Sequence, residues 1–170
     1  AVVMNAGAHG ADTASLLVSA EVLNPDGTVS TLTPDDLGYL YRTTVLQGEP
    51  RIVLSATLQL QPGGDPGAIK AATAADLHQR RATQPYHLPS CGSVFRNPKP
   101  HSAGQLIEAA GLKGFQIGQA QIAERHANFI LNLGGATAAD ILKVIRHAQS
   151  VIQDRHDIQL RPEVQILGAF

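Results

Sequence analysis

The chain has 170 residues, a length that suits one ordinary domain or two small ones. Hydrophobic residues make up 44% of it, which is enough for a buried core and argues against global disorder. The formal net charge is −1 with acidic and basic residues interspersed, so nucleic acid is a poor candidate partner.

The single cysteine, Cys91, excludes an internal disulfide and favours a reducing compartment. No apolar run approaches the roughly 18–20 residues that a membrane span needs, and nothing resembles a signal peptide. We therefore expect a cytoplasmic location and no membrane partner. The seven histidines lack the spacing of a metal motif, and one cysteine cannot form a thiolate cluster, so no metal site is predicted.

The chain begins with the apolar residues 1–4 and has no initiator methionine. Because chain termini usually lie at the surface, we interpret residue 1 as an interior point of a longer protein. Processing or trimming of a complete domain is the alternative. Residues 5–10 are small and glycine-rich, so their backbone can take unusual conformations and approach a ligand closely.

The next elements predict antiparallel structure. Residues 16–23 are rich in strand formers, and the turn sequence at 24–27 allows residues 28–32 to return as the second arm of a hairpin. Residues 33–36 (Thr-Pro-Asp-Asp) are typical of a helix start with Pro at the first helical position. Residues 51–60 predict another strand.

A Pro- and Gly-rich break at 61–67 precedes a polar, alanine-rich segment, 68–83, with helical spacing. Residues 84–100 contain four prolines and cannot form a regular helix. A long irregular segment in a compact chain is usually functional.

The remaining residues alternate between helix and strand. We predict a short helix over 103–110 with Gly111 as its cap, and strands within 121–133. An amphipathic helix begins at Thr137 and ends near His156, and residues 159–167 are predicted to form a closing strand. The expected fold class is α+β, with a mainly antiparallel first half and a small α/β second half.

The irregular segment carries a motif, Gly92-Ser93-Val94-Phe95-Arg96-Asn97-Pro98. It resembles the Gly-Ser-x-Phe-(Lys/Arg)-Asn-Pro signature of the UDP-N-acetylenolpyruvoylglucosamine reductase family. The preceding Pro89-Ser90-Cys91 is typical of that family's shorter subclass. Several short motifs in one order argue against chance similarity. Further matches follow the family's order: Met4-Asn5-Ala6-Gly7-Ala8-His9-Gly10, Tyr41-Arg42, Gln84-Pro85, Gly111-Leu112-Lys113-Gly114, His126-Ala127-Asn128-Phe129 and Pro162-Glu163-Val164.

The resemblance implies a flavoenzyme that uses FAD, with NADPH as co-substrate, to reduce a UDP-amino-sugar enolpyruvate to UDP-N-acetylmuramate, a peptidoglycan precursor. The family's flavin domain has a Gly-Gly-Gly-Ser-Asn-type phosphate loop that these 170 residues lack. We therefore expect residues 1–88 to be the C-terminal part of an FAD-binding domain and residues 89–170 the substrate-binding domain. The partner would be the missing N-terminal part, and the fragment alone would be inactive.

Three residues match the family's catalytic positions. Reduction of a double bond conjugated to a carboxylate needs an acid beside one carbon and donors facing the carboxylate. Ser93 matches the proton donor, Arg42 the arginine that steadies the carboxylate, and Glu163 their carboxyl partner. The alternatives are a serine that caps a loop, a surface arginine, and a glutamate paired with Arg161.

Other positions match binding contacts of the family. Cys91 has no evident base partner, so we discount it as a nucleophile. Packing is the alternative role for Tyr41. The implied substrate contacts are Asn97, Lys113, His126, Gln84, Arg81 and Tyr41. The implied cofactor contacts are Asn5, Ala6, Gly7, Ala8 and Gly10.

Two rival interpretations remain from the residues. The chain could be a UDP-sugar-binding module without catalysis, or another flavin oxidoreductase of the same fold. The combination of Ser93, Arg42 and Glu163 favours the reductase, because oxidases of that fold need no proton donor to carbon.

Overall fold

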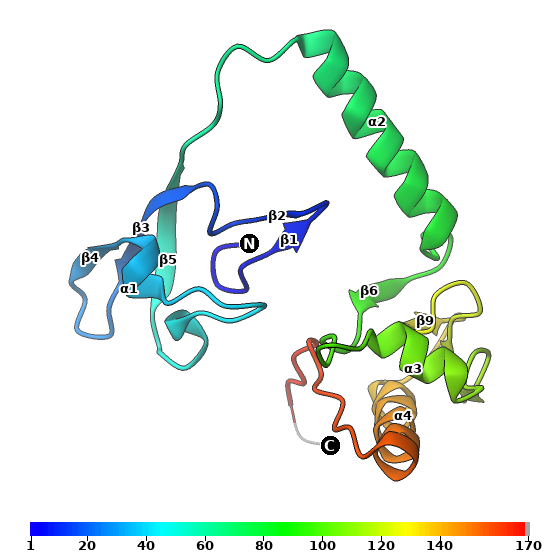
Figure 1. Cartoon of the computed structure of the whole chain (residues 1–170). Helices are drawn as coiled ribbons and strands as arrows, with labels where there is room; N and C mark the ends of the chain where they lie inside the picture. The colour runs from blue at the N-terminus through cyan, green and yellow to red at the C-terminus, as the bar shows by residue number, and fades with distance from the viewer. Residues whose placement is uncertain (169–170) are drawn as a thin grey trace. The chain divides into compact units, whose positions relative to one another are not determined.

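The chain divides at the Pro- and Gly-rich break that follows residue 60. A computed structural model describes residues 1–168 and separates two compact units, Ala1–Asp65 and Pro66 onward (Figure 1). Helices and antiparallel strands occur in both units, which confirms the predicted α+β class. The predicted domain boundary, between residues 88 and 89, stays a prediction.

Unit 1 is built on a three-stranded antiparallel sheet in the order β4-β3-β5. Strand β3 (Leu17–Leu23) turns at residues 24–27 into β4 (Val29–Leu32), and Gly27 adopts the positive φ of +83° that the turn requires. Strand β5 (Ile52–Leu58) pairs with the other edge of β3. The hairpin and the third strand are as predicted. One small core results, formed by Leu17, Ala20, Val22, Leu37 and Leu46.

Short elements complete unit 1. Strands β1 (Gly7–Ala8) and β2 (Ala11–Asp12) form a tight hairpin. Helix α1 (Pro34–Leu37) begins at the predicted cap, and this cap is a capping box, because the Thr33 side chain accepts the Asp36 N–H while the Asp36 carboxylate accepts the Thr33 N–H. A 3-10 turn, η1 (Val45–Gln47), precedes β5.

Unit 2 contains a four-stranded antiparallel sheet in the order β6-β9-β8-β7. Helix α4 packs against β7, β8 and α3. All residues of α2 are at least partly exposed. The helix therefore has no buried face and depends on the helix propensity of its alanine-rich sequence. The strands are β6 (Ser90–Ser93), β7 (Gln116–Ile117), β8 (Ala120–Ile122) and β9 (Phe129–Asn132). The helices are α2 (Pro66–Thr83), α3 (Ala103–Ala109) and α4 (Ala138–His156).

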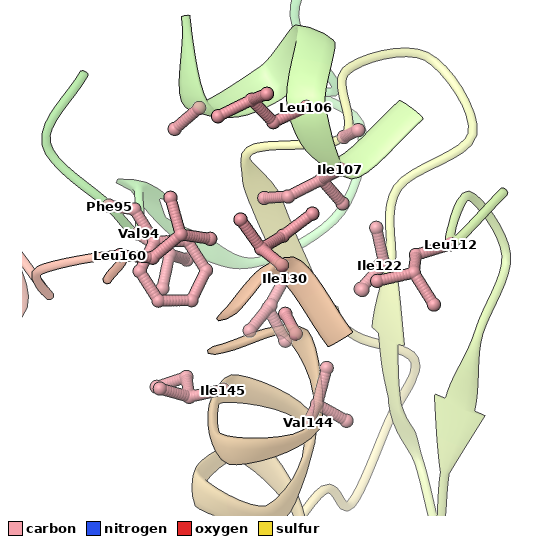
Figure 2. Packing of buried hydrophobic residues seen from close by; sticks show 14 of the residues in the cluster. Val94, Phe95, Leu106, Ile107, Leu112, Ile122, Ile130, Val144, Ile145 and Leu160 are labelled. Atoms are coloured by element: carbon pink, nitrogen blue, oxygen red, sulfur yellow. The ribbon is translucent and has the colours of Figure 1, made fainter. Parts of the chain in front are cut away.

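The core of unit 2 lies between its sheet and helices α3 and α4 (Figure 2). The apolar stripe of α4 contributes Val144, Ile145, Ala148 and Ile152, as its three- and four-residue spacing predicts. Phe95, from the signature motif, is 2% exposed within this cluster. The motif is therefore anchored in the core at one residue.

Two predictions for unit 2 need correction. Residues 84–100 are not wholly irregular, because β6 forms within them and pairs with β9. The predicted closing strand at 159–167 is wrong, since only one isolated bridge forms there, between Phe95 and Pro162. Two backbone bonds flank this bridge, from the Arg96 N–H to the Arg161 carbonyl and from the Glu163 N–H to the Val94 carbonyl.

Candidate active site

Most of the predicted cofactor residues gather around one cavity of unit 1. The cavity has a volume of about 270 Å³. Ala6, the remaining predicted contact, lies beside it in the chain and is not in its wall. The cavity is lined by Asn5, Gly7, Ala8, Gly10, Ala11, Asp12, Tyr41 and Arg42.

The glycines of this cavity are needed for its shape. A Cβ at Gly7 would lie 2.8 Å from the carbonyl oxygen of Ala11, closer than real Cβ contacts, so a side chain there would force the β1–β2 hairpin apart. Gly10 has a φ of +82°, which side-chain-bearing residues rarely adopt. The loop can therefore bring its backbone close to a ligand, as predicted from its composition.

Asn5 holds the cavity wall together from inside. Its side chain is buried, and its Nδ2 donates to Asp12 Oδ2 at 3.0 Å and to the Leu40 carbonyl at 3.2 Å. Its Oδ1 accepts the Ala14 N–H at 3.0 Å. Both amide N–H groups and the oxygen thus serve neighbouring chain segments. The Asn5 side chain is therefore committed to the wall, and the predicted cofactor contact at this residue stays a prediction.

Arg42 bridges two segments of the cavity wall. It sits in a two-residue turn between Leu40 and Thr43, with a φ of +54°. Its Nη1 and Nη2 donate to the carbonyls of Asn5 and Gly7 at 3.3 and 3.2 Å, and its guanidinium lies 5.0 Å from the Tyr41 ring centroid. These contacts hold the cationic group within the cavity wall, where an anionic ligand group could meet it.

Ser93 and Glu163 lie on paired segments of unit 2. Ser93 ends β6, and the next residue, Val94, accepts the Glu163 N–H at 2.7 Å. The adjacent N–H of Arg96 donates to the Arg161 carbonyl at 2.9 Å. Residues far apart in sequence are thus brought side by side. The third predicted catalytic residue, Arg42, belongs to unit 1.

Asn97 and His126 meet at the start of helix α3. The Asn97 Oδ1 accepts the Ala103 N–H at 3.0 Å, which satisfies one of the helix's unpaired amides. The His126 ring covers Gly104 so closely that a Cβ there would lie 3.3 Å from His126 Cε1. Two predicted substrate contacts therefore flank one helix end.

The tautomer and charge of His126 follow from its surroundings. Its Nδ1 accepts the Asn128 N–H at 3.3 Å, so the neutral ring carries its proton on Nε2. Partial burial lowers the pKa of His126 from 6.5, and Lys113 acts in the same direction, while a backbone hydrogen bond and Glu108 oppose them. The ring is therefore neutral at pH 7 and acts as a donor through Nε2.

We expect this pKa shift to appear in the stability of the chain. A histidine with a lower pKa in the folded state stabilises the fold fully above its unfolded pKa of about 6.5 and loses that contribution as the pH falls below it. His126→Gln should therefore reduce the fall in melting temperature between pH 7.5 and 5.5. His87→Gln, at an exposed loop histidine, is the control. Equal pH dependence in wild type and both variants would contradict the expectation.

Lys113 lies in a tight turn and is held by an acidic neighbour. Gly111 and Gly114 flank it with φ of +72° and +75°. Its Nζ donates to Glu108 Oε1 at 2.5 Å, and its side chain is 28% exposed. The ammonium group is thus oriented before any ligand arrives, although an anionic ligand must compete with Glu108 for it.

Arg81 and Gln84 lie at the C-terminal end of α2. Arg81 is exposed, and its carbonyl accepts a hydrogen bond from Arg125 Nη1 at 3.2 Å. Gln84 is partly buried and continues the helix by one backbone bond to Arg80. The predicted site residues thus fall into a unit 1 group around the cavity and a unit 2 group around β6 and α3.

Known proteins resemble this chain over its whole length. Residues 84–167 match the family described as UDP-N-acetylenolpyruvoylglucosamine reductase, C-terminal domain. The UDP-N-acetylenolpyruvoylglucosamine reductase of Nostoc sp. is 62% identical over 170 residues, which are 100% of this chain and 51% of the relative. That of Synechococcus elongatus is 54% identical, over 100% of this chain and 56% of the relative. The chain belongs to the UDP-N-acetylenolpyruvoylglucosamine reductase family.

A solved structure agrees with this membership. The crystal structure of UDP-N-acetylenolpyruvylglucosamine reductase from Thermus caldophilus matches with a TM-score of 0.78 at 36% identity, covering 97% of this chain and 58% of that chain. The chain spans about half the length of the curated relatives it matches.

Cys91 immediately precedes the signature motif, and its thiol is poorly suited to nucleophilic chemistry. Although the residue is exposed, partial burial of the sulfur raises the pKa of the Cys91 thiol. A raised pKa lowers the thiolate fraction at neutral pH, which agrees with our discounting it as a nucleophile.

Sequence reasoning missed two polar residues of this reductase-family chain. Asp12 lines the cavity and accepts from Asn5, and Asn128 binds the signature motif from the side. Asn128 stands within a family motif, which was a usable signal. Asp12 carried none. Within residues 1–168, no group of three or more His, Cys, Asp or Glu side chains is placed to hold a metal ion. No helix in that range is long and apolar enough to cross a membrane.

Proposed function

We propose that this chain is half of an enzyme that reduces UDP-N-acetylglucosamine enolpyruvate to UDP-N-acetylmuramate for peptidoglycan synthesis, using FAD and NADPH in the cytoplasm. Family membership supports the reaction class. The observation that carries the assignment is the pairing of the Ser93 segment with the Glu163 segment, through the 2.7 Å bond from Glu163 N–H to Val94.

The unit 1 cavity fits part of a flavin. Ligand sites usually measure 300–1,000 Å³, so a cavity of about 270 Å³ is large enough for one end of such a cofactor. Gly7, Ala8 and Gly10 bring no bulky side chain to the part of the wall that they form. Bound flavin would supply the hydride that adds to the terminal carbon of the enolpyruvyl group.

The chain's own residues would handle the charge that follows. Hydride addition leaves an electron pair on the neighbouring carbon, conjugated with the carboxylate. Arg42 would stabilise the carboxylate oxygens, because a guanidinium remains charged and matches a carboxylate in shape. Ser93 would transfer its hydroxyl proton to the carbon, completing the reduction. Glu163 would stabilise the same intermediate as a protonated or hydrogen-bonded carboxyl group.

Substrate binding would fall mainly to the unit 2 group, with Tyr41 of unit 1 as a further contact. His126 Nε2–H and the Asn97 amide lie beside α3 and would contact the sugar or enolpyruvyl group. Lys113 would meet a diphosphate or carboxylate oxygen, with Arg81, Gln84 and Tyr41 as outer contacts. Each offers a donor suited to an anionic UDP-sugar.

The test compares the full-length protein with the 170-residue chain. We expect the full-length protein to carry a flavin spectrum and to consume NADPH only when the enolpyruvate substrate is present. The isolated chain should show neither property and should bind the UDP-sugar at best. A full-length protein that binds the UDP-sugar but leaves NADPH unconsumed would replace the reductase with the binding-module interpretation.

A further inference from the structure

Asn128 makes an unusual set of contacts to the signature motif. It is 4% exposed, its Oδ1 accepts the Phe95 N–H at 2.9 Å, and its Nδ2 donates to the Phe95 carbonyl at 2.9 Å. Its own carbonyl accepts the Val94 N–H at 2.9 Å. One side chain therefore replaces a neighbouring strand at Phe95, satisfying both backbone groups of that residue.

The opposite edge of the same segment faces Glu163. Val94 accepts the Glu163 N–H at 2.7 Å, and Arg96 donates to the Arg161 carbonyl at 2.9 Å. The segment 94–96 is thus held between Asn128 on one edge and residues 161–163 on the other. Ser93 is the residue immediately before this segment, so its backbone position depends on both.

The same residue also reaches His126. The Asn128 N–H donates to His126 Nδ1 at 3.3 Å, the bond that leaves the histidine proton on Nε2. This bond comes from the Asn128 backbone and is independent of its side chain, whose two bonds both go to Phe95. An amide is suited to this position because it offers a donor and an acceptor together, which a carboxylate or an alkyl side chain cannot.

We propose that Asn128 is a positioning residue of the reductase reaction, whose side chain fixes the Ser93 hydroxyl relative to Glu163. This inference rests on the proposed function. The Asn128 side chain donates no proton to substrate and acts only through Ser93. Misplacement of a reacting group by about 1 Å can lower a rate about 100-fold, so such a brace affects the chemical step.

Asn132 provides a matched control at the other end of β9. It is also an asparagine, and its Oδ1 accepts two backbone N–H groups, from Gly134 at 2.9 Å and Ala136 at 3.0 Å. Asn132→Ala removes as many side-chain-to-backbone bonds as Asn128→Ala, but at a turn whose bonds do not involve residues 93–96. A general loss of stability should therefore affect both variants.

The experiment follows the two half-reactions of the full-length protein by stopped-flow absorbance of the flavin. In Asn128→Ala we expect flavin reduction by NADPH within about threefold of wild type, and reoxidation by the enolpyruvate substrate at least about tenfold slower. Asn132→Ala should change neither rate more than about threefold. Flavin reoxidation in the double variant Ser93→Ala/Asn128→Ala should be no slower than in Ser93→Ala alone, because both changes disable the same proton donor.

The outcomes separate the two proposals. A wild-type protein whose reduced flavin is not reoxidised by the enolpyruvate refutes the proposed function. If wild type reacts, normal reoxidation in Asn128→Ala, or multiplied losses in the double variant, overturns the role of Asn128. Should Asn128→Ala fail to fold, Asn128→Ser keeps a hydroxyl that can bond Phe95, and the same ratio of half-reactions decides. Failure of both variants to fold while Asn132→Ala folds would assign Asn128 to the fold alone.

Discussion

Full-length protein carrying Ser93→Ala is expected to accept electrons from NADPH at a normal rate and to pass them to the enolpyruvate at least about 100-fold more slowly. General acid catalysis contributes roughly 10²–10⁴-fold, and Ser93 is proposed to protonate only the substrate carbon. The measurement is the rate of flavin reduction by NADPH, followed separately by the rate of reoxidation by substrate.

Ser90→Ala is the matched control for this prediction. Ser90 begins β6 and Ser93 ends it, and both are exposed serines of one strand that pairs with β9. Ser90→Ala should retain both half-reactions. Equal slowing of reduction and reoxidation in Ser93→Ala would show that the hydroxyl supports the fold or the flavin site and not the protonation step.

Phe95→Ala is expected to lower the free energy of unfolding of the chain by about 3–5 kcal/mol. Phe95 is 2% exposed in the unit 2 core beside Val94 and Leu160 (Figure 2), so truncation leaves a cavity that this packed cluster cannot fill. Since small domains have only about 5–15 kcal/mol of stability, unit 2 would be close to unfolding. Urea denaturation followed by circular dichroism measures the change.

Phe115→Ala is the control for this change. Phe115 is partly buried and stacks on His147 with ring centroids 4.0 Å apart, outside the fully buried set. Its truncation removes the same atoms but less buried surface, so the loss should be clearly smaller. If the two substitutions cost the same, burial of Phe95 would not explain its effect.

These two predictions concern Ser93 and Phe95, which lie close together in the chain but have different roles. Within one motif, Ser93 is proposed to protonate the substrate, while Phe95 fixes the segment in the core and presents both backbone groups to Asn128. A change at Phe95 is therefore expected to reduce activity through stability. The half-reaction ratio separates this indirect loss from the direct loss in Ser93→Ala.

Several features followed from the sequence because they depend on residues close together in the chain. The hairpin over β3 and β4, the helix starts at Thr33 and Thr137, and the apolar stripe of α4 all arise within a few residues. Glycine at positive φ marked the turns for the same reason. The family signature likewise lies in one continuous segment, so it was visible without a fold.

Other features were decided by tertiary structure. Strand β6 exists because β9 supplies its partner groups, and residues 159–167 lack a comparable ladder, so Pro162 makes only a single bridge. The Asn128 brace joins residues 33 positions apart, and the Arg42 bonds to Asn5 and Gly7 join residues 37 and 35 positions apart. Sequence fixes what each side chain can donate or accept, but only the packed chain fixes which distant group it meets.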